Sequence, residues 1–370
     1  MCFFFGLTFL FLFYYIVFLW YFGKGFRQLK PGNNPKTPVV SVIVPARNES
    51  KNLPFLFHAL EQQNYPREKL EIVLVDDRSE DATYLLMDHF AKRHSHVKVI
   101  RITQKTSTMS PKKYALTQGI QNAKGEIIVT TDADAHPGSH WVATLMQYYT
   151  PETGMVIGYA PYRTDGPYDT LFHRLLALEY FSLAAVACAT AKRKFPTTCN
   201  GANLSFRKKV FEEVGGYGEK GKWLSGDDDL FLQTVFHRTS WKIDFAMGPD
   251  AAVFNNPPRT VGEWIRQRLR FSSKHLAYPW RVKWVLGGIY AFYVFLLSAT
   301  ILAIFRPNLF PLVLGIWGIK SLSEVIFLRK AKQKLEQRPL LRYYPLACVL
   351  HVLYVVFFPL LGQWIKPKWK

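Results

Sequence analysis

The sequence predicts an α/β domain with a mostly parallel β-sheet, held between apolar helices at the two ends of the chain. Three observations predict this class. Short β-branched runs alternate with helical patterns over roughly 250 residues in the middle of the chain, which is long enough for a full domain. An uncharged apolar run opens the chain, and three further apolar segments close it. Basic residues gather next to these apolar segments.

The composition excludes several classes of protein. The 370 residues include 47 Lys and Arg against 27 Asp and Glu, a formal net charge of +20, and 16% are aromatic, which excludes a disordered chain. A nucleic-acid-binding protein would place this charge within the soluble fold, so no nucleic-acid partner is expected. Cysteine spacing is not of the metal-binding type, and free thiols are expected at Cys2, Cys188, Cys199 and Cys348.

Four apolar segments predict membrane spans. The first, residues 3–22, is about long enough to cross a ~30 Å hydrocarbon core and lacks a cleavage site, so it predicts a retained anchor. The others are residues 284–305, 309–328 and 343–365. The second of these contains Lys320 and Glu324, which are one helical turn apart and are expected to pair.

The basic residues predict an orientation. Lys24, Arg27 and Lys30 directly follow the first run, so the positive-inside rule predicts that the middle domain faces the cytoplasm, at the cell inner membrane if the source is bacterial. The basic tail at residues 366–370 conflicts with this if the last segment crosses once. Two explanations stay open: that segment, which contains Pro345 and Pro359, folds back as a re-entrant hairpin, or another span is wrong.

These patterns divide the chain into four parts. Residues 1–23 are the anchor, 38–257 the α/β domain, 258–283 an amphipathic interfacial helix region, and 284–370 a membrane region of about three spans. Within the α/β domain, buried parallel strands are expected at residues 39–44, 71–75, 97–102 and 126–130. Three helices are expected. One begins near Leu53, one follows the second strand, and one covers residues 114–123.

Polar side chains follow three of these strands, where ligands of parallel sheets bind. They are Arg47 and Glu49, then Asp76 and Asp77, then Asp132 and Asp134. Two carboxylates at i and i+2 on a strand end point the same way, so Asp132 and Asp134 predict a Mg²⁺ or Mn²⁺ site that bridges to substrate phosphates. The alternative is that they form a turn.

Two later segments add acidic and basic groups. Three adjacent acids at residues 227–229 either cap a helix start or supply a general base, for which Asp228 is the candidate. Residues 261–276 form a basic amphipathic pattern, with Arg266, Arg270 and Lys274 opposite the apolar face, as in an interfacial helix. Gln267 and Arg270 lie one turn apart, and Arg270 could hold a diphosphate through two hydrogen bonds.

In this order the motifs resemble those of membrane-bound family 2 glycosyltransferases, which have a GT-A fold. The resemblance covers about residues 40–273, through motifs at residues 44–49, 75–79, 112–116, 132–134, 200–203, 226–228 and a Q-x-x-R-W-like motif at 267–271. It implies that a nucleotide-sugar donor, UDP-linked by family habit, is bound by Pro45, Arg47, Glu49, Asp76, Asp77, Lys112, Asp132, Gln267 and Arg270. It implies that Asp134, with Asp132, coordinates Mg²⁺ or Mn²⁺, and that the Asp227–Asp228 motif is catalytic, with Asp228 the base of an inverting transfer.

One departure from the family pattern bears on the product. Phe271 stands where the last motif usually has Trp, which weakens the case for a processive polysaccharide synthase. We therefore expect transfer of one sugar to a lipid or lipid-linked glycan acceptor at the cytoplasmic membrane face. The apolar stretch 175–191, too short and too interrupted by Glu179 to cross a bilayer, is expected to line the acceptor site or to be a core helix. A non-catalytic GT-A-like membrane scaffold is the remaining alternative.

Overall fold

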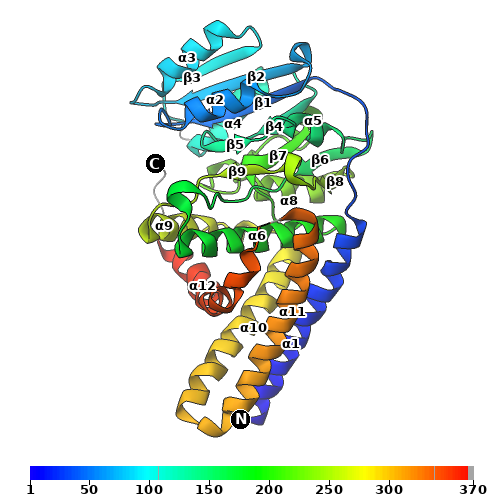
Figure 1. Ribbon diagram of the computed structural model, residues 1–370, viewed down its shortest axis with the longest axis vertical. Coiled ribbons are helices and arrows are strands. Elements are labelled where there is room, and N and C mark those ends of the chain that lie inside the picture. Colours follow the sequence, from blue (N-terminus) through cyan, green and yellow to red (C-terminus); the bar gives the residue numbers. More distant parts are fainter. Residues whose placement is uncertain (107, 337, 366–370) are drawn as a thin grey trace.

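The structure, a computed structural model, describes residues 1–106, 108–336 and 338–365. The predicted basic tail at residues 366–370 lies outside the described residues. An α/β domain lies at one end of a bundle of long apolar helices, and the N-terminus lies at the far end of that bundle (Figure 1).

The α/β domain contains a seven-stranded sheet in the order β3-β2-β1-β4-β7-β6-β8. Neighbouring strands are parallel except around β7, which is antiparallel to both β4 and β6. The strands are β1 Val40–Ala46, β2 Leu70–Asp77, β3 Val97–Ile102, β4 Ile127–Thr130, β6 Thr153–Ile157, β7 Leu204–Arg207 and β8 Lys242–Phe245. A second sheet pairs β5 (Ala135–Pro137) with β9 (Val253–Asn255). The predicted mostly parallel α/β fold is confirmed.

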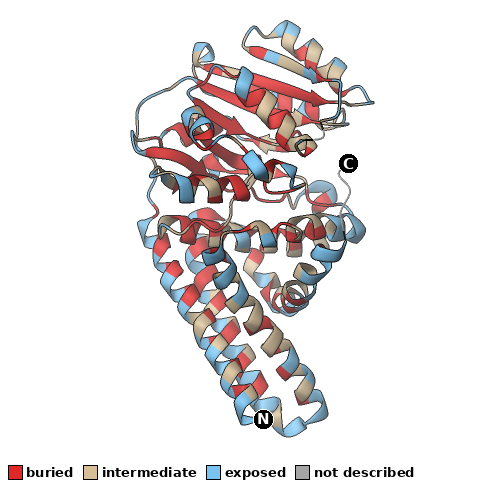
Figure 2. Cartoon of the chain, turned by 180° about the vertical axis from the view of Figure 1, so that it is seen from behind, coloured by how far each residue is buried: buried red, intermediate tan, exposed pale blue. Residues whose placement is uncertain are grey.

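Helices cover both faces of the large sheet. Because side chains alternate along a strand, Val42 and Val44 pack in one core and Ile43 packs in the other. The first core includes residues of α2 (Leu53–Glu61), α3 (Thr83–Arg93) and α5 (Trp141–Met146). The second includes residues of α4 (Pro111–Asn122), α6 (Leu171–Lys192), α7 (Lys208–Glu213) and α8 (Asp229–Arg238). Figure 2 shows the resulting band of buried strands.

The second core continues into the apolar bundle, which contains α1 (Cys2–Gly23), α10 (Trp280–Phe305) and α11 (Phe310–Leu335). α6 lies across the end of this bundle, between it and the sheet (Figure 1). It contacts β8 on one side and α1 and α11 on the other. The α/β domain and the helical bundle therefore share one hydrophobic core.

Several sequence-based boundaries need correction. α4 begins at Pro111, so Lys112 and Lys113 lie in its first turn rather than in a loop, because proline favours the first helical position. β2 extends through Asp76 and Asp77, which pair with β3 residues. The expectation that residues 175–191 are too short to cross a bilayer is wrong by length, since α6 has 22 residues. α6 nevertheless packs as a core helix, and its buried residues include Phe181, Ala185 and Cys188.

The last apolar segment is one helix, α12 (Tyr344–Trp364), so the re-entrant hairpin, one of the two explanations left open, is not formed. Its proline at the first turn is tolerated there, and Pro359 lies inside the helix. The segment just before α12 contacts α6, and the end of α12 packs on α9 (Val261–Ser272), where Gln363 Nε2 donates to Ser272 O at 3.0 Å. Both ends of α12 thus lie beside elements at the α/β end of the bundle (Figure 1).

The predicted faces of the amphipathic segment are partly wrong. α9 ends at Ser272, and it buries Arg268 and Leu269 while Val261 and Ile265 are exposed. Lys274, expected on the polar face, is buried beyond the end of the helix. The reason is tertiary: α9 packs against α12, and Arg268 pairs with Glu179 of α6 at 2.9 Å.

Candidate active site

Two loops interlock beyond the carboxyl ends of β1 and β2. Asn48 N donates to Ser79 Oγ at 3.0 Å, and Glu80 N donates to Asn48 Oδ1 at 2.8 Å. Glu49 N donates to Thr83 Oγ1 at 2.7 Å. The first two predicted strand ends are therefore held together as one edge of the candidate site.

Within this edge, two buried polar atoms lack hydrogen-bond partners. Asp76 is fully buried, and its Oδ2 accepts no hydrogen bond, although Arg101 Nε lies 3.8 Å away. Arg47 Nε is also without a partner. Asp77 is held by Arg78 through two hydrogen bonds, and Pro45 lies on β1 opposite Val75. Because unpaired buried polar atoms are costly, Arg47 and Asp76 offer hydrogen-bonding capacity to a ligand.

The predicted Asp132 and Asp134 lie in the turn between β4 and β5 rather than on the strand end, so the turn alternative describes their backbone. Lys112, from the first turn of α4, joins this turn to the three adjacent acids. Its Nζ lies 2.8 Å from Asp132 Oδ1 and 3.0 Å from Asp227 Oδ2. Segments about a hundred residues apart in the chain thus meet at one ammonium group.

The three acids at residues 227–229 have different partners. Asp227 pairs with Lys112, whereas Asp229 Oδ2 lies 2.6 Å from Lys274 Nζ. Asp228 lies between them; its Oδ2 accepts from Gly201 N at 3.1 Å and its Oδ1 from Asp229 N at 2.7 Å. Asp228 is therefore the N-cap of α8, as the helix-cap alternative expected, and its assignment as the general base stays a prediction.

Glycines permit this close arrangement. Gly226, immediately before the acids, has φ +82°, a conformation that favours glycine. At Gly201 a Cβ atom would lie 3.1 Å from Asp227 Oδ2. The carbonyl of Gly201 accepts from Thr130 Oγ1 at 2.8 Å, which fastens this loop to the end of β4.

Neighbouring carboxyls have opposite pKa shifts. Burial raises the pKa of Asp228 to about 6; the Lys274 charge opposes this rise, and the Asp229 and Asp227 charges add to it. Burial also disfavours the charged form of Asp227, but the charge and hydrogen bond of Lys112, together with the Lys113 and Arg270 charges, outweigh burial and lower the pKa of Asp227 to about 2. A carboxyl whose pKa approaches neutrality is suited to accept a proton during a reaction.

α9 carries the last two predicted residues, of which Arg270 approaches the acids. The Arg270 charge contributes to the lowered pKa of Asp227, and its guanidinium lies 5.2 Å from the centre of the Phe271 ring. Gln267 Oε1 accepts from Tyr162 OH at 3.0 Å. Phe271 keeps the flat ring of the expected Trp, and Arg268, Arg270 and Lys274 all lie within 6 Å of its centre.

The donor set fits a divalent cation that arrives with a substrate. Asp132 and Asp134 supply carboxylates, and among residues 1–106, 108–336 and 338–365 no group of three His, Cys, Asp or Glu side chains could hold a metal ion by itself. Mg²⁺ is typically bound by one or two carboxylates, with substrate phosphates and water completing its coordination. The residues present therefore fit such an ion better than a permanently bound structural one.

Three residues of this region were not singled out from the sequence as site residues. Lys113 Nζ donates to the carbonyls of Lys220, Trp223 and Ser225 and so holds the loop before the acids; burial lowers the pKa of Lys113 to about 8. Lys274 and Tyr278 both contact Asp229. The sequence signals for the two lysines were that Lys113 lies within the motif at residues 112–116 and that Lys274 follows closely after the motif at 267–271.

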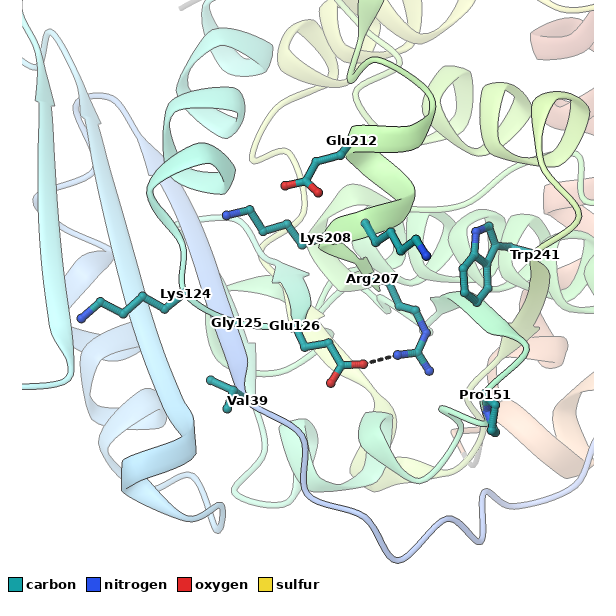
Figure 3. Close-up of a pocket in the computed structure, with 10 residues that line it drawn as sticks. Val39, Lys124, Gly125, Glu126, Pro151, Arg207, Lys208, Glu212 and Trp241 are labelled. Atoms are coloured by element: carbon teal, nitrogen blue, oxygen red, sulfur yellow. Dashed lines mark hydrogen bonds and ion pairs between the residues drawn. The ribbon is translucent and has the colours of Figure 1, made fainter.

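A surface cavity of about 500 Å³ lies elsewhere. Figure 3 shows its lining, which includes Glu126 paired with Arg207, and Trp241. Val39 precedes β1, Glu126 precedes β4, and Arg207 ends the antiparallel β7, so the cavity opens at the amino ends of the parallel strands. The cavity therefore lies at the opposite end of the parallel strands from the acids.

Comparisons with known proteins show what this chain is similar to. Residues 41–215 match the family model described as Glycosyl transferase family 2. The chain is 28% identical over 245 residues to "Probable glycosyltransferase YdaM" of Bacillus subtilis, covering 65% of this chain and 56% of that protein. It is 27% identical over 240 residues to the beta-monoglucosyldiacylglycerol synthase of Trichormus variabilis, covering 57% and 44%. The chain thus spans about half the length of these two curated relatives.

One solved structure is similar over nearly the whole chain. It is the mannosyltransferase PcManGT from Pyrobaculum calidifontis in complex with GDP-Man and Mn²⁺, with a TM-score of 0.60 and 20% identity. The similarity covers 89% of this chain and 94% of that one. The fold described above is therefore GT-A-like.

Proposed function

We propose, from the family 2 glycosyltransferase domain that this chain contains, that it transfers one sugar from a nucleotide-sugar donor to a lipid or lipid-linked glycan acceptor, with inversion at the anomeric carbon. UDP is the proposed nucleotide, and the cytoplasmic membrane face the proposed location. The proposal rests above all on one observation, the distribution of two lysines over three acids. Lys112 pairs with Asp227, and Lys274 lies 2.6 Å from Asp229 but 3.8 Å from Asp228, so Asp228 is held less closely than its two neighbours and is the proposed base.

The proposed step is a single displacement. The acceptor hydroxyl oxygen forms a bond to the anomeric carbon, the bond from that carbon to the diphosphate oxygen breaks, and its electron pair leaves with the nucleoside diphosphate. Asp228 accepts the hydroxyl proton. The charges of Lys112 and Arg270 stabilise the negative charge that develops on the leaving group. A divalent cation at Asp132 and Asp134 supplies further positive charge to the diphosphate when bound.

The interlocked loops after β1 and β2 are the proposed nucleotide site. Arg47 and Asp76 each keep a polar atom without a hydrogen bond there, and a nucleoside offers both donors and acceptors. We assign Pro45, Glu49 and Asp77 to the residues that surround the base and ribose of the nucleotide. Gln267 and Arg270 of α9 are assigned to the diphosphate.

A lipid or lipid-linked acceptor is favoured by the position of the site. α6 and α9 lie between the sheet and the apolar helices, and Leu183 of α6 and Ile265 of α9 are exposed large apolar residues. The name of the Trichormus relative describes a protein that acts on a diacylglycerol lipid. We assign these exposed apolar side chains to contact with the acyl part of such an acceptor.

The test is a screen of the purified full chain in detergent with phospholipid. UDP- and GDP-sugars are supplied singly with Mn²⁺ or Mg²⁺ and a lipid extract, and nucleoside diphosphate release is measured. We expect release with one donor class and a lipid product with one added sugar, whose anomeric configuration by NMR is opposite to that of the donor. A ladder of long products would support a processive synthase, and metal-dependent UDP or GDP binding without any transfer would support a scaffold.

A further inference from the structure

We propose that Lys274 is a positioning residue of this active site, which holds Asp229 and through it keeps Asp228 placed and ionised as the base. This inference rests on the proposed function, because it presupposes that Asp228 accepts the acceptor proton. Lys274 belongs to the amphipathic pattern at residues 261–276 but to none of the motifs that carry the family resemblance, and it lies two residues beyond the end of α9.

The contacts form a short chain from Lys274 to the base. Lys274 Nζ lies 2.6 Å from Asp229 Oδ2 and 3.8 Å from Asp228 Oδ1. Tyr278 OH donates to the same Asp229 oxygen at 2.5 Å. Asp229 N in turn donates to Asp228 Oδ1 at 2.7 Å. A displaced Asp229 would therefore move a donor of the base as well.

Burial makes the lysine charge important. The side chains of Lys274 and Asp229 are only 8% and 3% exposed, so water screens their charges poorly. Removing one partner of a buried pair leaves the other charge uncompensated. Without Lys274, Asp228 and Asp229 would lose the ammonium group nearest to both of them, and the proton of Asp228 would be held more tightly.

Other groups near Asp228 do not replace this charge. Its charged and titratable neighbours come from its own loop, from α4, from the loop between α6 and β7, from the residues after α7 and from the segment after α9: Asp227, Asp229, Lys113, Cys199, Tyr217, Lys274 and Tyr278. Lys113 already donates to three carbonyls, and Lys112 lies against Asp227 and Asp132. Lys274 is the ammonium that lies between Asp228 and Asp229.

The same segment connects the site to the apolar bundle. Lys274 Nζ lies 5.6 Å from the centre of the Phe271 ring. Further along the same segment, the side chains of Leu276 and Trp280 are 65% and 64% exposed. α10 begins at Trp280. The position of Lys274 therefore depends on the positions of the end of α9 and the start of α10, between which it lies.

The test compares Lys274→Met with Lys274→Arg in the full chain, using Lys209→Met as a matched control because Lys209 is exposed and lines the cavity at the opposite sheet edge. Nucleoside diphosphate release from the nucleotide sugar that turns over gives kcat, KM and their pH dependence. Calorimetric binding of UDP with Mn²⁺ reports the donor site. We expect Lys274→Met to lower kcat about tenfold or more at neutral pH, with partial recovery at higher pH. UDP affinity should change less than about threefold, and Lys274→Arg and Lys209→Met should keep the wild-type pH profile.

Two results would overturn the inference: a wild-type kcat and pH profile in Lys274→Met, or an equal loss in Lys274→Arg with unchanged unfolding temperature. If Lys274→Met does not fold, Lys274→Gln, which removes only the charge, takes its place under the same two criteria. Asp228→Asn separates this inference from the proposed function. Full activity of Asp228→Asn refutes the assigned base, whereas an inactive Asp228→Asn beside a wild-type-like Lys274→Met refutes only the role of Lys274.

Discussion

Tyr15 donates a hydrogen bond of 2.8 Å to Glu324, and this contact joins the first apolar helix to a helix more than 300 residues later in the chain. Tyr293 donates to the same oxygen at 3.0 Å. The other oxygen accepts from Tyr344 at 2.6 Å and from Lys320 at 3.0 Å. The Lys320–Glu324 pair expected from the sequence is confirmed, and one carboxylate connects α1, α10, α11 and α12.

We predict that Glu324→Ala strongly destabilises the chain. The substitution leaves the fully buried Lys320 without its partner and removes the acceptor of three hydroxyls, a loss of about 3–5 kcal/mol. Thermal unfolding of detergent-solubilised protein, followed by tryptophan fluorescence, measures it. Ser323→Ala is the matched control, since that hydroxyl donates to Ile319 O within its own helix. Equal unfolding temperatures for the two variants would contradict the role assigned to Glu324.

Gly362→Ala should loosen the contact of α12 with α9. A Cβ at Gly362 would lie 2.7 Å from Ser272 Cβ and 3.1 Å from Leu269 O, so one of the two helices must move. We expect a loss of about 1–3 kcal/mol in stability and reduced transfer. Gly315→Ala, which would meet nothing within 4 Å, should be neutral or slightly stabilising in the same assays. The contact is dispensable if both alanine variants match the wild type.

The raised pKa of Asp228 predicts a specific pH dependence of stability. Because the folded state binds this proton more tightly than the unfolded chain, the contribution of Asp228 is most favourable below about pH 4 and is lost as the pH rises through about 6. Asp228→Asn should therefore unfold at a higher temperature than the wild type at pH 7.5, with the difference shrinking towards pH 4. Unfolding scans at both pH values test this. A stabilisation that is the same at pH 4 and 7.5 would count against the shifted pKa.

The position of α12 predicts that its end lies on the same side of the membrane as the α/β domain. Trp364 is 86% exposed, and Cys2 is an exposed native thiol at the opposite end of α1. In sealed vesicles, an impermeant maleimide should label Trp364→Cys only from the face that does not label Cys2. Labelling of both positions from one face would show that α12 crosses the membrane.

Much of the α/β domain could be predicted from the sequence because its strands are short β-branched runs with polar residues at their ends. The strand at residues 97–102 was predicted with its observed bounds, and the mostly parallel sheet follows from the alternation of strands and helices. The antiparallel β7 was not predicted. β7 has only four residues, and its pairing with β4 and β6 depends on contacts distant in sequence.

The site was predicted less completely. The acids at residues 132 and 227–229 stand out as motifs, but which cation pairs with which acid depends on tertiary structure. Lys274 reads as a solvent-exposed residue of an amphipathic pattern, since helical periodicity places it opposite the apolar face. The helix ends at Ser272 instead, and the chain turns Lys274 inward towards Asp229. Similarly, periodicity could not indicate that Arg268 is buried against Glu179.

The most direct test of the central claim is sugar transfer by Asp228→Asn, with Asp250→Asn, at an exposed acid elsewhere on the domain, as the control. If Asp228 is the base, transfer should fall by about 10²–10⁴-fold while UDP with Mn²⁺ binds with unchanged affinity. Asp250→Asn should retain wild-type transfer. Undiminished transfer by Asp228→Asn would contradict the account.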